Sequence, residues 1–439
     1  MLKLVLGASG SGKTTLLYAR IRARAEAGKR SILLVPEQFT SSTEARIYRE
    51  LGDALSGMVE SYSFTSLAEH ILAALGGAAV QTLTDAGRAV LVRRALEELQ
   101  DNVHYYYRHR RSAAFCQMAA ETIDELKSAG LSGQQLQELA RDCGTESAKL
   151  GELALIFQGY ESLLAGTGMD PADRLELAAD RLEAALARDE LPDFLREREV
   201  FIDEFDTFNA PKKRLMGAML AALPAVTVAL CEDGAPMQPG DLELFSGAKQ
   251  VAAQLRQLAR KNGAQVAAPE LLRRDLRHKD APGLAALTEL LETGSCTPPE
   301  SAPELRLFAA ASREEEARCA AAAIRRLMRQ GVRCGKIAVV YRDISLYRAA
   351  VRYEFRMAEI PLYCDEPTTP EFSAPATAVR ALLALLRGAD MTEQLTVLAK
   401  TGLCDLTEPE VCALENYAYT WSPNAAAWRA EFTKSPRGF

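Results

Sequence analysis

The sequence predicts an α/β protein in which a parallel sheet is interrupted by a long helical insertion. A short apolar run at the amino terminus leads through a Gly-rich loop into a helical pattern, and further strand and helix patterns alternate after it with short links. Such alternation is typical of a parallel, doubly wound sheet. From about residue 80 to residue 195, strand patterns disappear and helical patterns follow one another. The sheet is therefore expected to resume only after this insertion.

Composition sets broad limits on the protein. Its 439 residues suggest roughly three domains, and 48% hydrophobic and 25% charged residues are ordinary for a globular protein. No run of 18 apolar residues occurs, and the amino terminus lacks the features of a signal peptide, so we expect a cytoplasmic protein without a membrane span. A net charge of −7 does not indicate a general nucleic-acid surface, although an acidic protein can still concentrate basic residues in a DNA channel.

The nine cysteines are scattered, and none shows C-x-x-C spacing. We therefore expect reduced thiols rather than a disulfide framework, and no zinc or iron–sulfur site within this chain.

The first strand and helix enclose a phosphate-binding motif. Residues 2–6 have the length and apolarity of a buried strand, and residues 13–27 carry apolar positions at helical spacing. The loop between them matches G-x-x-x-x-G-K-[ST] in full, at Gly7, Ala8, Ser9, Gly10, Ser11, Gly12, Lys13 and Thr14. In such a loop, backbone N–H groups and the helix amino terminus bind phosphate, the lysine reaches the β and γ phosphates, and the threonine hydroxyl binds Mg²⁺. The motif predicts a site for ATP and Mg²⁺.

Further patterns continue this sheet and then leave it. Residues 31–35 and 57–62 are predicted strands, and a helix follows up to Gly76 and Gly77, which end it. The insertion is predicted to contain helices at 84–100, 111–129, 132–141, 146–165 and 171–188.

An acidic pair marks the return to the sheet. The stretch 198–208 contains an apolar strand that ends in Asp203 and Glu204, and residues 225–230 form another buried strand. In a P-loop protein, Asp203 is expected to bind the shell of the Mg²⁺ ion and Glu204 to polarise the attacking water. The alternative is a strand end with two solvated acids.

An ordered set of motifs carries a family resemblance over nearly the whole chain. The set consists of "LGASGSGKT", "LLVPEQFT", "SYSFTSLAEHIL", "FIDEFDTF", "REEEARCAAAAIRRLMRQGVRCGKIAVVYRDISLYRAAV", "EIPLYCDEP" and "KTGLCDLTEPEVCALENY". The first motif is shared by all P-loop proteins, whereas the ordered set is much more specific. It resembles the amino-terminal part of AddB, the B subunit of the bacterial AddAB (RexAB) helicase–nuclease.

The resemblance implies a superfamily 1 helicase-like fold. Its implied parts are a first RecA-like domain at 1–78 and 196–290, a helical insertion at 79–195, a linker at 291–304, the start of a second RecA-like domain at 305–372, and the start of a second helical insertion at 373–439. Within the second RecA-like domain we expect strands at 305–312 and 336–343 and a helix at 313–330.

The resemblance also implies partners. A member of this family binds single- and double-stranded DNA together with an AddA-like helicase–nuclease subunit, acts in double-strand break repair, and recognises the Chi hotspot on the exiting strand. The DNA-binding residues implied here are Gln38, Phe39, Thr40, Ser61, Tyr62, Ser63 and Phe64. The stretch "HYYYRHRR" at 104–111 combines basic and aromatic residues, so it is either a phosphate-contacting and stacking surface or a partly buried Tyr cluster beside a solvated basic face.

Several family features have no counterpart in these 439 residues. They include the upstream glutamine element that reads adenine, a clear Gly-Asp-x-x-Gln sensor after 225–230, the late helicase motifs, and the nuclease domain with its iron–sulfur cysteines. We therefore expect a gene fragment or a truncated form whose own ATPase activity is doubtful. Relatives often carry a neutral residue where this chain has Glu204, so the site need not be inactive. A stand-alone P-loop kinase and a non-enzymatic module in which ATP only tightens the fold are the alternatives.

Overall fold

The computed structural model describes residues 1–77, 81–236, 244–364 and 370–434, and divides the chain into two compact units. The first unit is Met1–Arg306 and the second is Leu307–Phe439. The predicted boundary at 78 and 79 and the predicted end of the last segment at 435–439 lie outside the described residues. No helix in the described part of the chain is long and apolar enough to span a bilayer.

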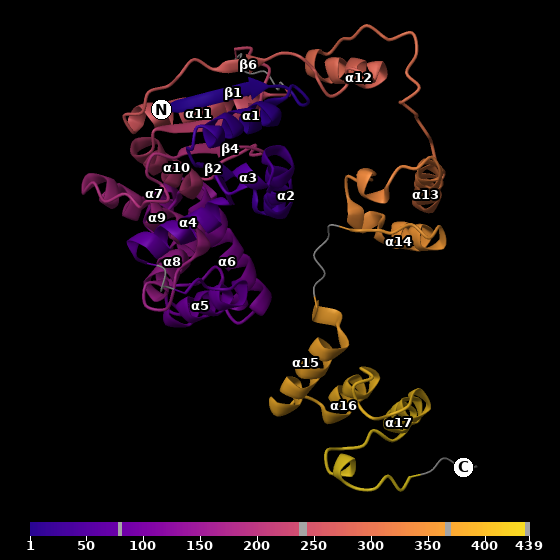
Figure 1. Cartoon of the computed structure of the whole chain (residues 1–439). Coiled ribbons are helices and arrows are strands. Elements are labelled where there is room, and N and C mark those ends of the chain that lie inside the picture. Colours follow the sequence, from indigo (N-terminus) through magenta and orange to yellow (C-terminus); the bar gives the residue numbers. More distant parts are fainter. Residues whose placement is uncertain (78–80, 237–243, 365–369, 435–439) are drawn as a thin grey trace. The chain divides into compact units, whose positions relative to one another are not determined.

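The first unit is built on a six-stranded, all-parallel sheet, which confirms the predicted α/β fold class (Figure 1). Its strands are β1 (Leu2–Gly7), β2 (Ser31–Leu34), β3 (Val59–Tyr62), β4 (Glu199–Ile202), β5 (Ala225–Cys231) and β6 (Glu270–Leu272). Their order across the sheet is β3-β2-β4-β5-β1-β6. The carboxyl ends of β1 and β4 therefore lie on either side of β5, at one edge of the sheet.

Helices cover both faces of this sheet. One face carries α1 (Lys13–Glu26), α2 (Thr40–Leu51) and the short α3 (Asp53–Ser56), whose apolar residues share a core with Val5, Leu33 and Phe201. The other face is packed by α4 (Phe64–Leu75), α9 (Pro171–Ala187), α10 (Ala210–Ala222) and α11 (Ser246–Lys261). The central strands β2, β4 and β5 are buried on both sides because both faces are covered, and this explains why their sequences are largely apolar.

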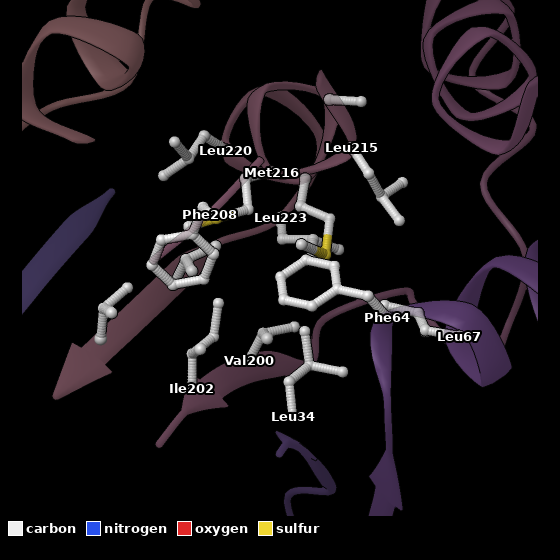
Figure 2. Packing of buried hydrophobic residues seen from close by; sticks show 14 of the residues in the cluster. Leu34, Phe64, Leu67, Val200, Ile202, Phe208, Leu215, Met216, Leu220 and Leu223 are labelled. Carbon is white, nitrogen blue, oxygen red and sulfur yellow. The ribbon is translucent and has the colours of Figure 1, made fainter. Parts of the chain in front are cut away.

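Figure 2 shows the larger core from close by. Phe64 of α4 and Met216 of α10 lie over Val200 and Ile202 of β4, and Phe208 packs beside them. The Phe64 ring meets those of Phe205 and Phe208 edge-on, with centroids 5.2 and 6.0 Å apart. This aromatic contact joins the end of β4 to the start of α4.

Between α4 and β4, the described residues form a series of helices. These helices are α5 (Asp85–Glu98), α6 (Ala113–Ser128), α7 (Gly133–Arg141), α8 (Ser147–Leu164) and α9 (Pro171–Ala187), each within a few residues of its prediction. The first four share a core that includes Phe115, Phe157 and Tyr160, whereas α9 packs on α4 and α10 beside the sheet. The insertion thus continues into the layer that covers the sheet.

The first unit ends after β6 with α12 (Pro282–Thr293). The second unit contains α13 (Arg313–Arg329), α14 (Arg348–Met357), α15 (Ala374–Leu386), α16 (Met391–Lys400) and α17 (Glu408–Trp421). The helix predicted at 313–330 is therefore confirmed.

The strands predicted at 305–312 and 336–343 are wrong, because neither stretch is part of a ladder in the described structure. Leu307 is 102% exposed and Val340 is 89% exposed. An apolar segment becomes a strand only when a neighbour pairs its backbone, and neither stretch has such a neighbour among the described residues. The apolar composition of these stretches predicted strands, but no sheet of the described residues pairs with them.

Candidate functional site

The P-loop joins β1 to α1 at the carboxyl edge of the sheet. Gly10 and Gly12 have φ of 82° and 92°, a region that suits glycine, and Gly12 precedes the first helical residue. The N–H of Leu16 donates to Gly12 O at 2.9 Å and begins the helix. The two glycines thus allow the sharp reversal that exposes the amino end of α1 to a ligand.

Lys13 lies folded onto the loop. Its Nζ donates to Gly7 O at 2.7 Å and to Ala8 O at 2.8 Å. Burial lowers the pKa of Lys13, while Cys231 and Asp203 raise it and Arg277 lowers it further. The ammonium group is therefore held by backbone carbonyls within reach of the loop it is expected to serve.

The acidic pair predicted from the sequence lies opposite this loop. Asp203 is 6% exposed, its N–H donates to Leu34 O at 3.1 Å, and its Oδ1 accepts the Glu204 N–H at 3.0 Å. Burial raises the pKa of the Asp203 carboxyl, and a hydrogen bond with the Thr14 side chain is the largest effect that lowers it. The structure thus brings Thr14 and Asp203 together, from β1–α1 and β4.

Glu204 has an unusual backbone. Its φ of 65° lies in the left-handed region, which non-glycine residues rarely adopt and which tends to occur at functional sites. Burial raises the pKa of its carboxyl, nearby Asp203 raises it further, and Arg46 lowers it. The chain is therefore strained at the residue expected to polarise water.

One cavity of about 540 Å³ collects these groups. Lys13, Thr14, Asp203 and Glu204 line it together with two arginines that carry no sequence motif. Arg46 of α2 lies with its guanidinium 4.9 Å from the centre of the Tyr18 ring, and Arg277 follows β6. The volume lies in the range usual for small-molecule sites.

The donors here fit a magnesium ion that is shared with a phosphate ligand. In the described residues, no group of three or more His, Cys, Asp or Glu side chains could hold a metal by itself. Mg²⁺ usually binds one or two protein oxygens and completes its shell with water and substrate phosphates. A Thr14 hydroxyl next to the Asp203 carboxylate is a donor set of that kind.

The residues expected to bind DNA separate into two groups. Gln38, Ser63 and Phe64 line a second cavity of about 350 Å³ at the carboxyl ends of β2 and β3, which also contains Phe205 and Lys212. The remaining predicted residues, Phe39, Thr40, Ser61 and Tyr62, do not line it.

Burial limits what some of these side chains offer. Phe64 is 2% exposed inside the core, and this leaves no free ring face for a base. Ser63 forms the capping box of α4 with Ser66, at 3.1 and 2.8 Å. The Tyr62 hydroxyl donates to Glu60 Oε2 at 2.7 Å, whereas Gln38 and Phe39 are exposed in the short 3₁₀ helix η1 (Glu37–Phe39). Of the residues expected to bind DNA, the exposed Gln38 and Phe39 are therefore better placed to contact a DNA strand than the buried Phe64.

The stretch 104–111 is held by a carboxylate in the helical insertion. Glu152 of α8, 9% exposed, accepts the N–H groups of His104, Tyr105 and Tyr106 at 2.7, 2.6 and 3.1 Å. Tyr105 is exposed, and Tyr106 packs on Phe115. Tyr106 is partly buried at the base of this stretch and Tyr105 faces solvent, as the interpretation of a partly buried Tyr cluster expects. Contact of the stretch with phosphate and bases stays a prediction.

Sequence reasoning missed Arg46, Arg277 and Lys212 because a lone basic residue on a helix or turn carries no motif. Each comes close to the sites only through the fold.

Comparisons with known proteins agree with this architecture. A family model described as "ADDB, N-terminal" matches residues 4–288. Three similar relatives each bear the name of the B component of an ATP-dependent helicase/deoxyribonuclease. That of Desulforudis audaxviator is 32% identical over 97% of this chain and 37% of its own length. Those of Moorella thermoacetica and Symbiobacterium thermophilum are 31% and 30% identical, each over 98% of this chain and 38% of the relative.

The chain thus spans a little over a third of the length of the curated relatives it matches. The family model covers most of the first unit, and the similarity to the relatives extends through nearly all of the second. On this evidence, the chain belongs to the AddB family and corresponds to its amino-terminal region.

Proposed function

We propose that this chain is the nucleotide-binding, helicase-like part of an AddAB-type helicase–nuclease that processes DNA double-strand ends for recombinational repair. The name of the relatives, which makes them one component of an ATP-dependent helicase/deoxyribonuclease, supports the role. Family membership leaves the stand-alone kinase without support. The relatives' activities belong to proteins much longer than this chain, so each of them is a proposal here.

The observation that carries the proposal is the single cavity shared by Lys13, Thr14, Asp203 and Glu204. These residues come from segments almost two hundred positions apart, and the order of β1, β5 and β4 brings them to one edge. A cation, a hydroxyl and two carboxylates around a Gly-rich loop suit Mg-ATP better than a neutral ligand.

The residues would divide the work as follows. Lys13 leaves Gly7 O and Ala8 O and donates to the β and γ phosphate oxygens. Thr14 and Asp203 would hold Mg²⁺, which neutralises phosphate charge when it is bound. Glu204 accepts a hydrogen bond from a water molecule and orients it toward the terminal phosphate. Arg46 stays beside the two carboxylates and offsets their negative charge.

Nucleotide binding is tested by calorimetry on the full 439-residue chain. Lys13→Ala should weaken Mg-ATP binding by about ten- to a hundredfold, because it removes charge-assisted hydrogen bonds to phosphate. Lys29→Ala, an exposed lysine outside this cavity, is the matched control and should leave the affinity unchanged. Equal affinity of the Lys13→Ala variant and the unmodified chain would refute the phosphate role.

The proposal also includes partners. We expect the chain to assemble with an AddA-like protein, to contact single- and double-stranded DNA, and to take part in recognising Chi, a role in keeping with the cytoplasmic location expected from its sequence. The relatives' name, which describes a subunit, supports the assembly. Co-purification with an AddA-like protein followed by filter binding of single-stranded DNA tests both points. A complex that forms but retains no DNA would contradict the DNA role alone.

A further inference from the structure

The turn that follows β6 lies directly against the P-loop. The N–H of Leu276 donates to Gly10 O at 3.0 Å, and Arg277 Nη1 donates to Ser9 Oγ at 3.1 Å. The end of β6 is equally close, since a Cβ added at Gly7 would lie 2.7 Å from Leu272 O. The loop and the turn are therefore packed as one structure, although they are more than 250 residues apart in the sequence.

The turn has its own internal support. Asp275 Oδ1 accepts the N–H groups of Arg277 and His278 at 3.0 and 3.1 Å, and its Oδ2 lies 2.8 Å from His278 Nδ1. These bonds close the turn around one carboxylate. They hold the backbone of Leu276 and Arg277 in place while both side chains remain exposed.

The glycines of the P-loop fit this turn closely. A Cβ at Gly10 would lie 2.9 Å from Arg277 Cβ and 2.9 Å from Asp275 Oδ1. A Cβ at Gly12 would lie 3.0 Å from Leu276 Cδ1. The loop therefore needs glycine at these positions for the turn as well as for its own backbone conformation.

Leu276 is unusual for an apolar side chain. It is 54% exposed, yet it lines the cavity that contains Lys13 and Thr14. An exposed leucine beside Gly12, where α1 begins, offers an apolar surface in a cavity that also contains the charged side chains of Lys13, Asp203 and Glu204. A nucleoside triphosphate has the matching chemistry, because its base has flat faces that pack on apolar groups and its sugar joins that base to a chain of phosphates.

We propose that the turn at 273–278 forms the nucleoside side of the nucleotide site, with Leu276 packing on the base and Arg277 binding a phosphate oxygen. The inference rests on the proposed function, since it assigns the other half of the same pocket. Leucine presents no hydrogen-bonding group, so this wall does not distinguish one base from another by hydrogen bonds. It supplies packing for the base and does not read its edge.

Tripolyphosphate separates the two halves of the site, because it carries the phosphates without a nucleoside. Affinities of the full 439-residue chain for Mg-ATP and for Mg-tripolyphosphate are measured by calorimetry. Leu276→Ser should weaken Mg-ATP about tenfold, from the lost apolar contact, and leave tripolyphosphate unchanged. Arg277→Ala should weaken both ligands, about tenfold each.

Arg274→Ala is the matched control, because Arg274 is exposed in the same turn and does not line the cavity. It should change neither affinity, and circular dichroism of each variant should match that of the unmodified chain. If Leu276→Ser leaves Mg-ATP binding intact, or weakens both ligands equally, the base-packing role is wrong while the phosphate site stands. If the unmodified chain binds neither ligand, the proposed function fails as well.

Discussion

Replacing Glu204 with glycine should stabilise the protein and abolish any ATP hydrolysis that depends on this carboxylate. The φ of 65° at Glu204 places a residue with a side chain in the left-handed region. This conformation costs roughly 1–2 kcal/mol of folding free energy. Glycine relieves this strain but loses about 0.5–1 kcal/mol through its greater freedom in the unfolded chain. The net expectation is about 0.5–1 kcal/mol of added stability.

Removing the negative charge of Glu204 should also stabilise the folded protein. Burial and then nearby Asp203 raise the pKa of the Glu204 carboxyl, so the ionised form is disfavoured in the folded protein. Above its raised pKa, this carboxylate makes folding less favourable than it is for a neutral side chain. Removing it at neutral pH therefore adds to the gain from the backbone.

Urea unfolding separates these two contributions through three variants. Glu204→Gln and Glu204→Ala remove the charge but keep a side chain at positive φ, whereas Glu204→Gly also removes the strain. The glycine variant should exceed the alanine variant by about 0.5 kcal/mol or more. A glycine variant no more stable than the alanine variant would show that the residue is not strained. Glu204→Gln should bind Mg-ATP normally but hydrolyse it at least a hundredfold more slowly, on the order of effects from lost catalytic groups.

Three further outcomes follow from the structure. Met216→Ala should cost about 2–5 kcal/mol in urea unfolding, since Met216 is fully buried in the larger core, and a loss below 1 kcal/mol would contradict its packing there. Mg-ATP affinity should fall as pH drops toward the raised pKa of Asp203, at a pH above the value of about 4 usual for aspartate, and Asp203→Asn should remove this dependence. Glu152→Ala should leave the three N–H groups at 104–106 without their acceptor. Trypsin should then cleave faster after Arg108, Arg110 and Arg111, whereas the control Glu146→Ala on the same insertion should not change the cleavage rate.

Much of the first unit was predictable because its signals are local. A parallel strand covered on both faces is largely apolar, so β2, β4 and β5 stand out as short apolar runs. The P-loop is equally local, since a fixed spacing of glycines is needed for its backbone.

The missed parts depend on the fold rather than on local pattern. β6 has three residues, and Leu271 is 37% exposed, so no apolar periodicity marks it. It is a strand because β1 offers a free edge. The stretches at 305–312 and 336–343 show the opposite case. They have the composition of strands, but in the described residues no neighbouring strand pairs with them. The turn at Leu276 and Arg277 reaches the P-loop only because β6 pairs with β1.

The residue at position 204 bears on whether the proposed site only binds a nucleotide or also hydrolyses it. A site that only holds Mg-ATP needs the loop, Lys13, Thr14 and Asp203, and it gains nothing from a second acid at position 204. Here that position has an acid despite backbone strain and despite repulsion from Asp203. Glycine or asparagine would adopt the same φ at lower free energy. Asp189, Glu197 and Glu359 also have positive φ, so the backbone conformation alone does not single out Glu204. What sets Glu204 apart is that it also lines the cavity, and this supports the proposed role in orienting water. Hydrolysis stays a prediction, and the Glu204→Gln variant tests it.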